Sequence, residues 1–164
     1  MEFKLGPHNT LYEKSQPWNF EVDSDAAQLE QDMIAFMKQH NGIGLAAPQI
    51  GIAKRVFVMG CDSLEGFPSP FVAFNPVILN ASEEEELGDE GCLSYPDLWL
   101  KVKRPKTVVA EYQDAKGNTY TVEMSGLIAR CFQHELDHLN GICFVDKVSQ
   151  MKLNLAMKKL RKKK

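Results

Sequence analysis

Two histidines one helical turn apart carry the clearest chemical signal in the sequence. His134 and His138 stand at positions i and i+4 in the run His134-Glu135-Leu136-Asp137-His138, an H-E-x-x-H pattern. On an α-helix these positions share one face, so both imidazoles can reach a single metal ion. Glu135 projects beside them, where a carboxylate can act as a general base toward water. The pattern therefore predicts a hydrolytic metal site.

A site of this kind needs a third protein ligand and one open position. The positions that common zinc proteases use downstream are not suitable here, because position 144 is Phe144 and no glutamate follows Glu135. Asp146 is the only acid beyond the predicted helix. The third ligand is therefore expected upstream, and Cys92 is the candidate because a thiolate binds zinc or ferrous iron strongly. The alternative is that Cys92 is a small buried apolar residue.

A glycine-containing run supplies a third group of candidate residues, Gly42-Ile43-Gly44-Leu45-Ala46-Ala47-Pro48-Gln49. It is not a dinucleotide-binding fingerprint, because no strand is predicted before it and no third glycine follows at the required spacing. Its glycines permit tight backbone turns. Gln49 offers a neutral N–H that can stabilise an oxyanion without competing for a metal ion.

The remaining cysteines and histidines carry weaker signals. Cys131 lies three residues before the first histidine of the pattern, on the same side of the helix, and is expected to line the pocket. Cys61 and Cys143 are interpreted as core or surface thiols, and His8 and His40 as ordinary surface or loop residues.

Hydrophobic periodicity predicts the elements that must position these side chains. Residues 24–40 form an amphipathic helix, with Asp25 and Gln28 placed as a capping box and Asn41-Gly42 as a stop. Residues 125–140 form the helix that carries the histidines, and a shorter basic helix follows at 149–160. Short strands are expected between them, at 55–59, 71–74, 77–79 and 99–102, and in a hairpin of 107–112 and 119–122. The predicted class is α+β, with antiparallel β-sheets packed around a central metal-binding α-helix.

The composition indicates one globular domain over residues 1–164. The chain carries 19 Lys+Arg and 22 Asp+Glu, a formal charge of −3, and 44% of its residues are hydrophobic. At this length about two thirds of the unfolded surface can be buried. No apolar run has the length of a membrane span or a signal peptide, so we expect a cytoplasmic protein with free thiols and no membrane partner.

Charge is distributed unevenly along the chain. Residues 146–164 contain eight Lys and Arg against Asp146 alone, a charge of +7, whereas residues 1–145 carry −10. A basic C-terminal helix and tail at 149–164 can contact an anionic surface. The alternative is a solvated, frayed end. The acidic run at 83–86 is interpreted as a solvated edge or loop.

Taken together, the run 42–49, the segment Glu90-Gly91-Cys92-Leu93-Ser94 and the helix segment Gln133-His134-Glu135-Leu136-Asp137-His138 closely resemble the three motifs of the peptide deformylase family. The resemblance covers residues 24–146. It implies an α+β fold and a metal-dependent hydrolase of protein biosynthesis. Such an enzyme removes the formyl group from the N-terminal formyl-methionine of new polypeptides co-translationally and releases formate.

The resemblance also implies the metal site. Cys92, His134 and His138 would be the ligands, with water in the fourth position. The ion would be ferrous iron, which nickel, cobalt or zinc can replace. Glu90 and Arg104 are expected to pair and hold the cysteine loop, with two unpaired surface charges as the alternative.

The catalytic roles follow from the same resemblance. Glu135 would be the general base, and the side-chain N–H of Gln49 and the backbone N–H of Leu93 would hold the oxyanion. An apolar slot for the methionine side chain is expected from Ile43, Leu127, Cys131 and the stem of Arg130. The full set of expected substrate-binding residues is Ile43, Gly44, Gly91, Leu127, Arg130 and Cys131.

Two departures from the family pattern concern the substrate and a partner. Many members have an arginine seven residues after the metal cysteine, where this chain has Trp99. Only 26 residues follow His138, whereas many bacterial relatives end in a longer helix that docks on the ribosome. The lysine-rich end can still contact ribosomal RNA through its phosphates; no DNA partner is expected.

Three other functions fit parts of the pattern. A metallopeptidase lacks its downstream ligand here. A zinc-stabilised binding module would fill all four metal positions with protein, and it has no need of Glu135. A member of the family that has lost activity would be expected to lack a residue of the metal site, and none is missing.

Overall fold

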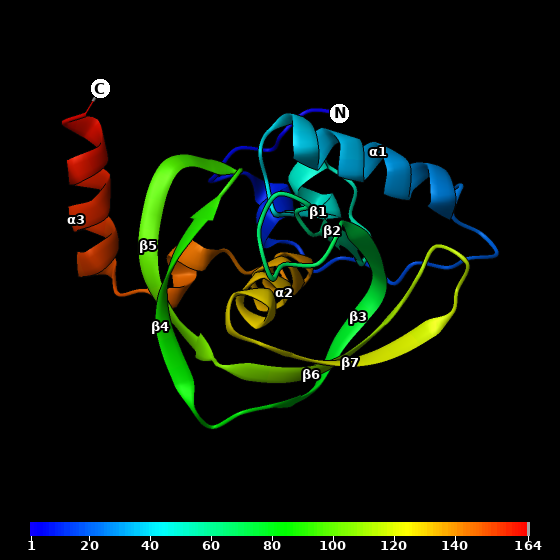
Figure 1. The fold of residues 1–164 in the computed structure, drawn as a ribbon. Coiled ribbons are helices and arrows are strands. Elements are labelled where there is room, and N and C mark those ends of the chain that lie inside the picture. Colours follow the sequence, from blue (N-terminus) through cyan, green and yellow to red (C-terminus); the bar gives the residue numbers. More distant parts are fainter. Residues whose placement is uncertain (164) are drawn as a thin grey trace.

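The computed structural model describes residues 1–163; Lys164, the last residue of the predicted tail, lies outside them. Helix α2 (Gly126–Leu139) runs through the middle of the molecule, between a five-stranded sheet and a two-stranded sheet (Figure 1). Both sheets are antiparallel. Helix α1 (Ala26–Gln39) lies beside β1 and β2, and α3 (Gln150–Arg161) lies outside β5. The predicted α+β class with a central helix is confirmed.

The five-stranded sheet follows the order β1-β2-β3-β6-β7. The predicted hairpin is confirmed, with β6 and β7 joined by a turn in which Asp114 Oδ1 accepts the N–H groups of Lys116 and Asn118. The strands are β1 (Gly44–Ala46), β2 (Val56–Met59), β3 (Phe71–Ala81), β6 (Thr107–Gln113) and β7 (Thr119–Ser125).

Strand β3 corrects the prediction of two separate pieces at 71–74 and 77–79. The strand continues through Pro76 because its register against β6 shifts between Phe74 and Val77 and again between Ile78 and Asn80. Asn75 adopts φ 49° at the first irregularity. A β-bulge removes the need for a ladder hydrogen bond at the proline, so the residue that seemed to end the strand is tolerated within it.

The two-stranded sheet was only partly predicted. It pairs β4 (Glu85–Cys92) with β5 (Tyr95–Pro105), whereas only residues 99–102 of the second strand were expected. The charged residues that hid β4 lie opposite charges of the other sign, as in the ion pairs Lys103–Glu85 at 3.1 Å and Lys101–Asp89 at 3.2 Å. Strand β1 was also missed, since the glycines of the run 42–49 were expected to form tight backbone turns.

The helices begin and end close to their predicted bounds. Asp25 caps α1 by accepting the N–H of Gln28 at 3.1 Å, but the Gln28 side chain donates to Asp32, so the capping box is half formed. Short 3₁₀ helices occur at η1 (Asn9–Tyr12), η2 (Ala47–Ile50) and η3 (Phe144–Lys147). Within the described residues, no helix is both long and apolar enough to cross a membrane.

Helix α2 is enclosed by protein on most of its surface. Phe132 packs edge-to-face on Phe57 of β2, with ring centroids 4.9 Å apart, in a core between the helix and the five-stranded sheet. Such packing also buries polar residues of the helix. These must find partners inside the protein, because an unpaired buried polar group is costly. The buried polar residues of α2 are Arg130, Gln133, His134, Glu135 and His138.

Candidate metal centre

The three predicted ligands converge from two elements. Cys92 is the last residue of β4, and His134 and His138 lie on successive turns of α2. Their ligand atoms all lie within 4.8 Å of one another, and Cys92 Sγ is 3.4 Å from His138 Nε2. One thiol and two imidazoles in a tight group form a donor set typical of zinc and other transition-metal sites.

The electrostatics of the two histidines differ. Burial lowers the pKa of His138 well below its usual range, which keeps this imidazole neutral and able to act as a ligand. Burial also opposes the charged form of His134, but hydrogen bonds to Cys92 and Glu90 raise its pKa to about 10. Groups that favour a proton on His134 equally favour a divalent cation in the same place. The residues therefore fit a metal ion.

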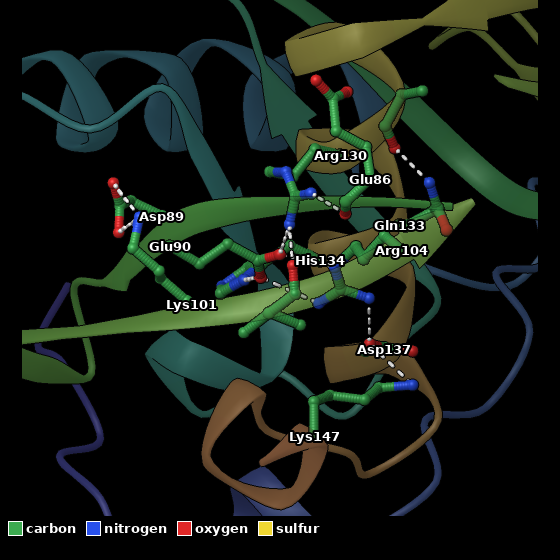
Figure 2. A network of polar contacts seen from close by, with 12 residues as sticks. Glu86, Asp89, Glu90, Lys101, Arg104, Arg130, Gln133, His134, Asp137 and Lys147 are labelled. Carbon is green, nitrogen blue, oxygen red and sulfur yellow. Dashed lines mark hydrogen bonds and ion pairs between the residues drawn. The ribbon is translucent and has the colours of Figure 1, made fainter. Parts of the chain in front are cut away.

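Glu90 lies at the centre of a buried polar network (Figure 2). Its Oε1 accepts from His134 Nδ1 at 2.9 Å, and Arg104 donates to both of its oxygens at 2.6 and 2.9 Å. Arg104 also donates to Asp137 at 2.7 Å. Although burial opposes its charge, the hydrogen bonds from His134 and Arg104 hold the pKa of Glu90 well below its usual range. The predicted pair of Glu90 and Arg104 is confirmed.

This network orients the first histidine. Because Nδ1 of His134 donates to Glu90, Nε2 is the nitrogen left for a metal ion, which takes the place of the second proton of the ring. The same carboxylate lies on β4 two residues before Cys92. One buried side chain therefore fixes both the tautomer of His134 and the distance between the strand and the helix that carry the candidate ligands.

Arg130 belongs to the same network, which the sequence did not indicate. Its guanidinium donates to Glu90 Oε2 at 2.7 Å, to the carbonyl of Val102 at 2.8 Å and to the carbonyl of Glu86 at 2.7 Å. A Cβ at Gly88 would lie 2.8 Å from Arg130 Cζ, so a glycine is required there. Residue types alone could not reveal these contacts, because the partners lie 28 to 44 residues away.

Gln49 is held with its amide facing the candidate ligands. Its Oε1 accepts the N–H of Ala46 at 2.9 Å, and its Nε2 donates to Ser94 Oγ at 3.1 Å and to Cys92 Sγ at 3.4 Å. The side chain is 1% exposed. Ser94 belongs to the same motif segment as Cys92. Its hydroxyl helps to set the direction of the Gln49 N–H groups.

Glu135 lies between the helix and strand β1. Its side chain is buried, and burial raises its pKa to about 7. Within the described residues, Oε2 has no hydrogen-bond partner. A Cβ at Gly44 would collide with the carboxylate, so this glycine allows the backbone of β1 to approach it. Glu135 is therefore a desolvated carboxylate free to accept a proton.

A pocket of about 740 Å³ opens beside these residues. Tyr95 and Trp99 line it although neither was predicted to do so, and the indole of Trp99 is 66% exposed and packs over Gly91. His40, expected to be an ordinary surface residue, also lines it. His138 is fully buried and is not among the lining residues. The predicted residues that line the pocket are Ile43, Gly44, Gln49, Gly91, Cys92, Leu93, Leu127, Arg130, Cys131, His134 and Glu135.

Comparisons with known proteins agree on one family. A family model described as polypeptide deformylase matches residues 2–154. The peptide deformylase of Rhizobium meliloti is 41% identical over 141 residues, which cover 86% of this chain and 81% of that protein.

Solved structures give the same result. A peptide deformylase from Synechococcus elongatus, in complex with actinonin, has a TM-score of 0.87 and 36% identity, covering 96% of this chain and 84% of that one. A peptide deformylase from Acinetobacter baumannii with Met-Ala-Ser bound has a TM-score of 0.82 and 35% identity, covering 90% and 98%.

Replacing the central carboxylate tests the network. Glu90→Gln leaves buried Arg130 without its counter-charge and leaves Arg104 paired with Asp137 alone, so we expect it to lower the free energy of unfolding by about 3–5 kcal/mol. Glu86→Gln is the matched control, because that side chain is exposed and only its backbone carbonyl contacts Arg130. Urea unfolding measures both. Equal stability of the two variants would contradict the central role of Glu90.

Proposed function

This chain belongs to the peptide deformylase family, metal-dependent hydrolases that remove the N-formyl group from newly made polypeptides, and we propose that Cys92, His134 and His138 hold its metal ion. The observation that supports this assignment is the convergence of one thiol and two imidazoles beside a buried carboxylate and an open pocket. The formylated N-termini of nascent peptides fit the family's reaction.

We propose ferrous iron as the native ion, with nickel, cobalt or zinc able to replace it. A thiolate and two neutral imidazoles accept all four ions with modest preferences, so the ion is set by supply and by the remaining coordination position. When bound, a divalent ion supplies a Lewis acid beside the scissile formyl group. The protein's own residues then orient the substrate and move the protons.

Glu135 is proposed as the general base and acid. Its carboxylate removes a proton from the water that attacks the formyl carbon, and it later delivers that proton to the leaving amine as the C–N bond breaks. The products are formate and a peptide with a free N-terminal methionine. The buried position of Glu135 and its raised pKa of about 7 suit a group that must both accept and release a proton near neutral pH.

Two N–H donors are proposed to stabilise the negative charge that develops on the formyl oxygen. One is Nε2 of Gln49, whose direction is set by Ser94 and Ala46. The other is the backbone N–H of Leu93, beside Cys92. Removal of one such donor typically lowers kcat by about 100- to 1,000-fold.

The methionine side chain is assigned to the apolar part of the pocket. Ile43, Leu127 and Cys131 line this region with the stem of Arg130, whose charged head is withdrawn into the Glu90 network. Gly44 and Gly91 line the same pocket, where the absence of a side chain makes room for the Glu135 carboxylate and the Trp99 indole. The bound Met-Ala-Ser of the Acinetobacter protein supports the choice of formyl-Met-Ala-Ser as a probe.

We also propose that residues 1–164 act as one catalytic domain in the cytoplasm, where nascent chains are made, and that α3 contacts the ribosome. The apolar side of α3, with Leu153, Ala156, Met157 and Leu160, packs beside β5. Its lysines at 152, 158 and 159 are exposed. Clustered lysines attract nucleic-acid phosphates without reading sequence.

Formate release with and without the proposed base tests the function directly. The metal-loaded protein should release formate from formyl-Met-Ala-Ser, and Glu135→Gln should retain the metal but lower kcat by about 100- to 10,000-fold. A peptide blocked by an acetyl group serves as the control for peptidase activity. Cleavage of that peptide, or full activity of the variant, would exclude the proposed mechanism.

Substrate series test the methionine slot. Formyl-norleucine peptides should react at a kcat/KM close to that of formyl-methionine, because the two side chains have similar length and polarity. The kcat/KM of formyl-aspartate peptides should be lower by at least about 100-fold, because an unpaired carboxylate would have to leave water to enter the slot. Equal values for norleucine and aspartate would refute the slot.

Charge reversal tests the ribosome contact. The double variant Lys158→Glu/Lys159→Glu should sediment less with ribosomes and show a weaker dependence of binding on salt. The matched control is Lys14→Glu/Lys116→Glu, which changes the net charge equally at two exposed positions away from α3. Unchanged sedimentation of the α3 variant would end this proposal.

A further inference from the structure

Residues 3–6, here called the N-terminal strap, lie across two of the three motif segments. The N–H of Lys4 donates to the carbonyl of Gln49 at 2.7 Å, and the N–H of Gly6 donates to the carbonyl of Ser94 at 2.8 Å. Gln49 lies in η2, next to the five-stranded sheet, whereas Ser94 lies in the turn between β4 and β5 of the other sheet. The strap therefore joins both sheets at the edge of the pocket.

Side chains fix the strap at both of its ends. The ring of Phe3 packs on the rings of Phe36, in α1, and of His40, directly after α1. The ring centroids are 4.8 Å apart in both pairs. At the other end, Gly6 lies so close to the ring of Tyr95 that a Cβ would collide with it. At the same end of that ring, the hydroxyl of Tyr95 lies 2.7 Å from the hydroxyl of Tyr12. The strap is therefore a packed element and not a loose end.

The two residues that the strap joins also meet through a side chain. Gln49 Nε2 donates to Ser94 Oγ at 3.1 Å and to Cys92 Sγ at 3.4 Å. The strap holds the backbone carbonyls of both partners, so it controls how far η2 stands from the 92–95 turn. A displacement of about 1 Å of a group that acts on the transition state can lower a rate by about 100-fold.

We propose that the N-terminal strap is a positioning element for Gln49, acting through the backbone hydrogen bonds of Lys4 and Gly6. This inference rests on the proposed function, in which the Gln49 amide holds the oxyanion. The strap makes no contribution of its own to the chemistry. It sets the position of the Gln49 N–H groups relative to Cys92, although the strap itself lies at the N-terminus.

Two substitutions in the strap separate this role from simple stability. Lys4→Pro removes the N–H that donates to Gln49, and Gly6→Ala keeps every N–H but pushes the strap away from Tyr95. Glu2→Pro is the matched control, a proline two residues earlier at an exposed position. If Lys4→Pro does not fold, Gly6→Ala decides the test.

The measurements are kcat and KM of the metal-loaded protein for formyl-Met-Ala-Ser, together with the NMR resonance of the Gln49 side-chain amide. We expect Lys4→Pro and Gly6→Ala to lower kcat about 10- to 100-fold with little change in KM, because an interaction made in the transition state is disturbed. Both should shift the Gln49 amide resonance, and Glu2→Pro should leave kcat and resonance unchanged.

A double-mutant cycle provides the decisive control. In a Gln49→Ala background, Lys4→Pro should lower kcat no further, because the residue through which the strap acts is gone. A full additional loss in that background, or a Lys4→Pro protein that matches Glu2→Pro, would overturn the proposal. If the wild-type protein releases no formate, the proposed function fails, and the Gln49 resonance still reports whether the strap positions that amide.

Discussion

The carboxylate of Glu90 is buried between α2 and the two-stranded sheet, where His134, Arg104 and Arg130 all donate hydrogen bonds to it. A buried charge is tolerated only when it is paired and its lone pairs are used. Here two carboxylates, Glu90 and Asp137, face two guanidinium groups, and Lys147 adds a contact to Asp137 from the outside. Because the arginines offset the charge of the acids, Glu90 stays ionised and accepts from Nδ1 of His134, which leaves the other ring nitrogen of His134 for a metal ion.

The rest of the site follows from this constraint. Helical spacing places His138 on the same face as His134, and the strand that carries Glu90 ends two residues later at Cys92. The turn after Cys92 brings Ser94 to Gln49, so the third motif segment is attached to the same frame. The pocket then forms where β1, the 92–95 turn and α2 meet, with Glu135 desolvated at its wall. One buried ion network thus relates three segments that are distant in the sequence.

Residue types and spacing were sufficient for the features that depend on local geometry. The i, i+4 histidines predicted a helix face, and the Asp25 cap and the Asn41-Gly42 stop gave the bounds of α1. Features that depend on partners far along the chain were not predictable in this way. The guanidinium of Arg130 and the strap contact of Lys4 with Gln49 are examples. Strand β4 was missed because its charges resemble a solvated loop until Lys101 and Lys103 are placed opposite them.

X-ray absorption spectroscopy of the zinc-loaded protein measures directly whether Cys92, His134 and His138 bind one ion. We expect one ion per chain with a single sulfur at about 2.3 Å and two imidazole nitrogens at about 2.0–2.1 Å. The sulfur signal should vanish in Cys92→Ala and persist in Cys131→Ala. A site with two sulfur ligands, with a third imidazole, or with a sulfur signal that survives Cys92→Ala would contradict this assignment.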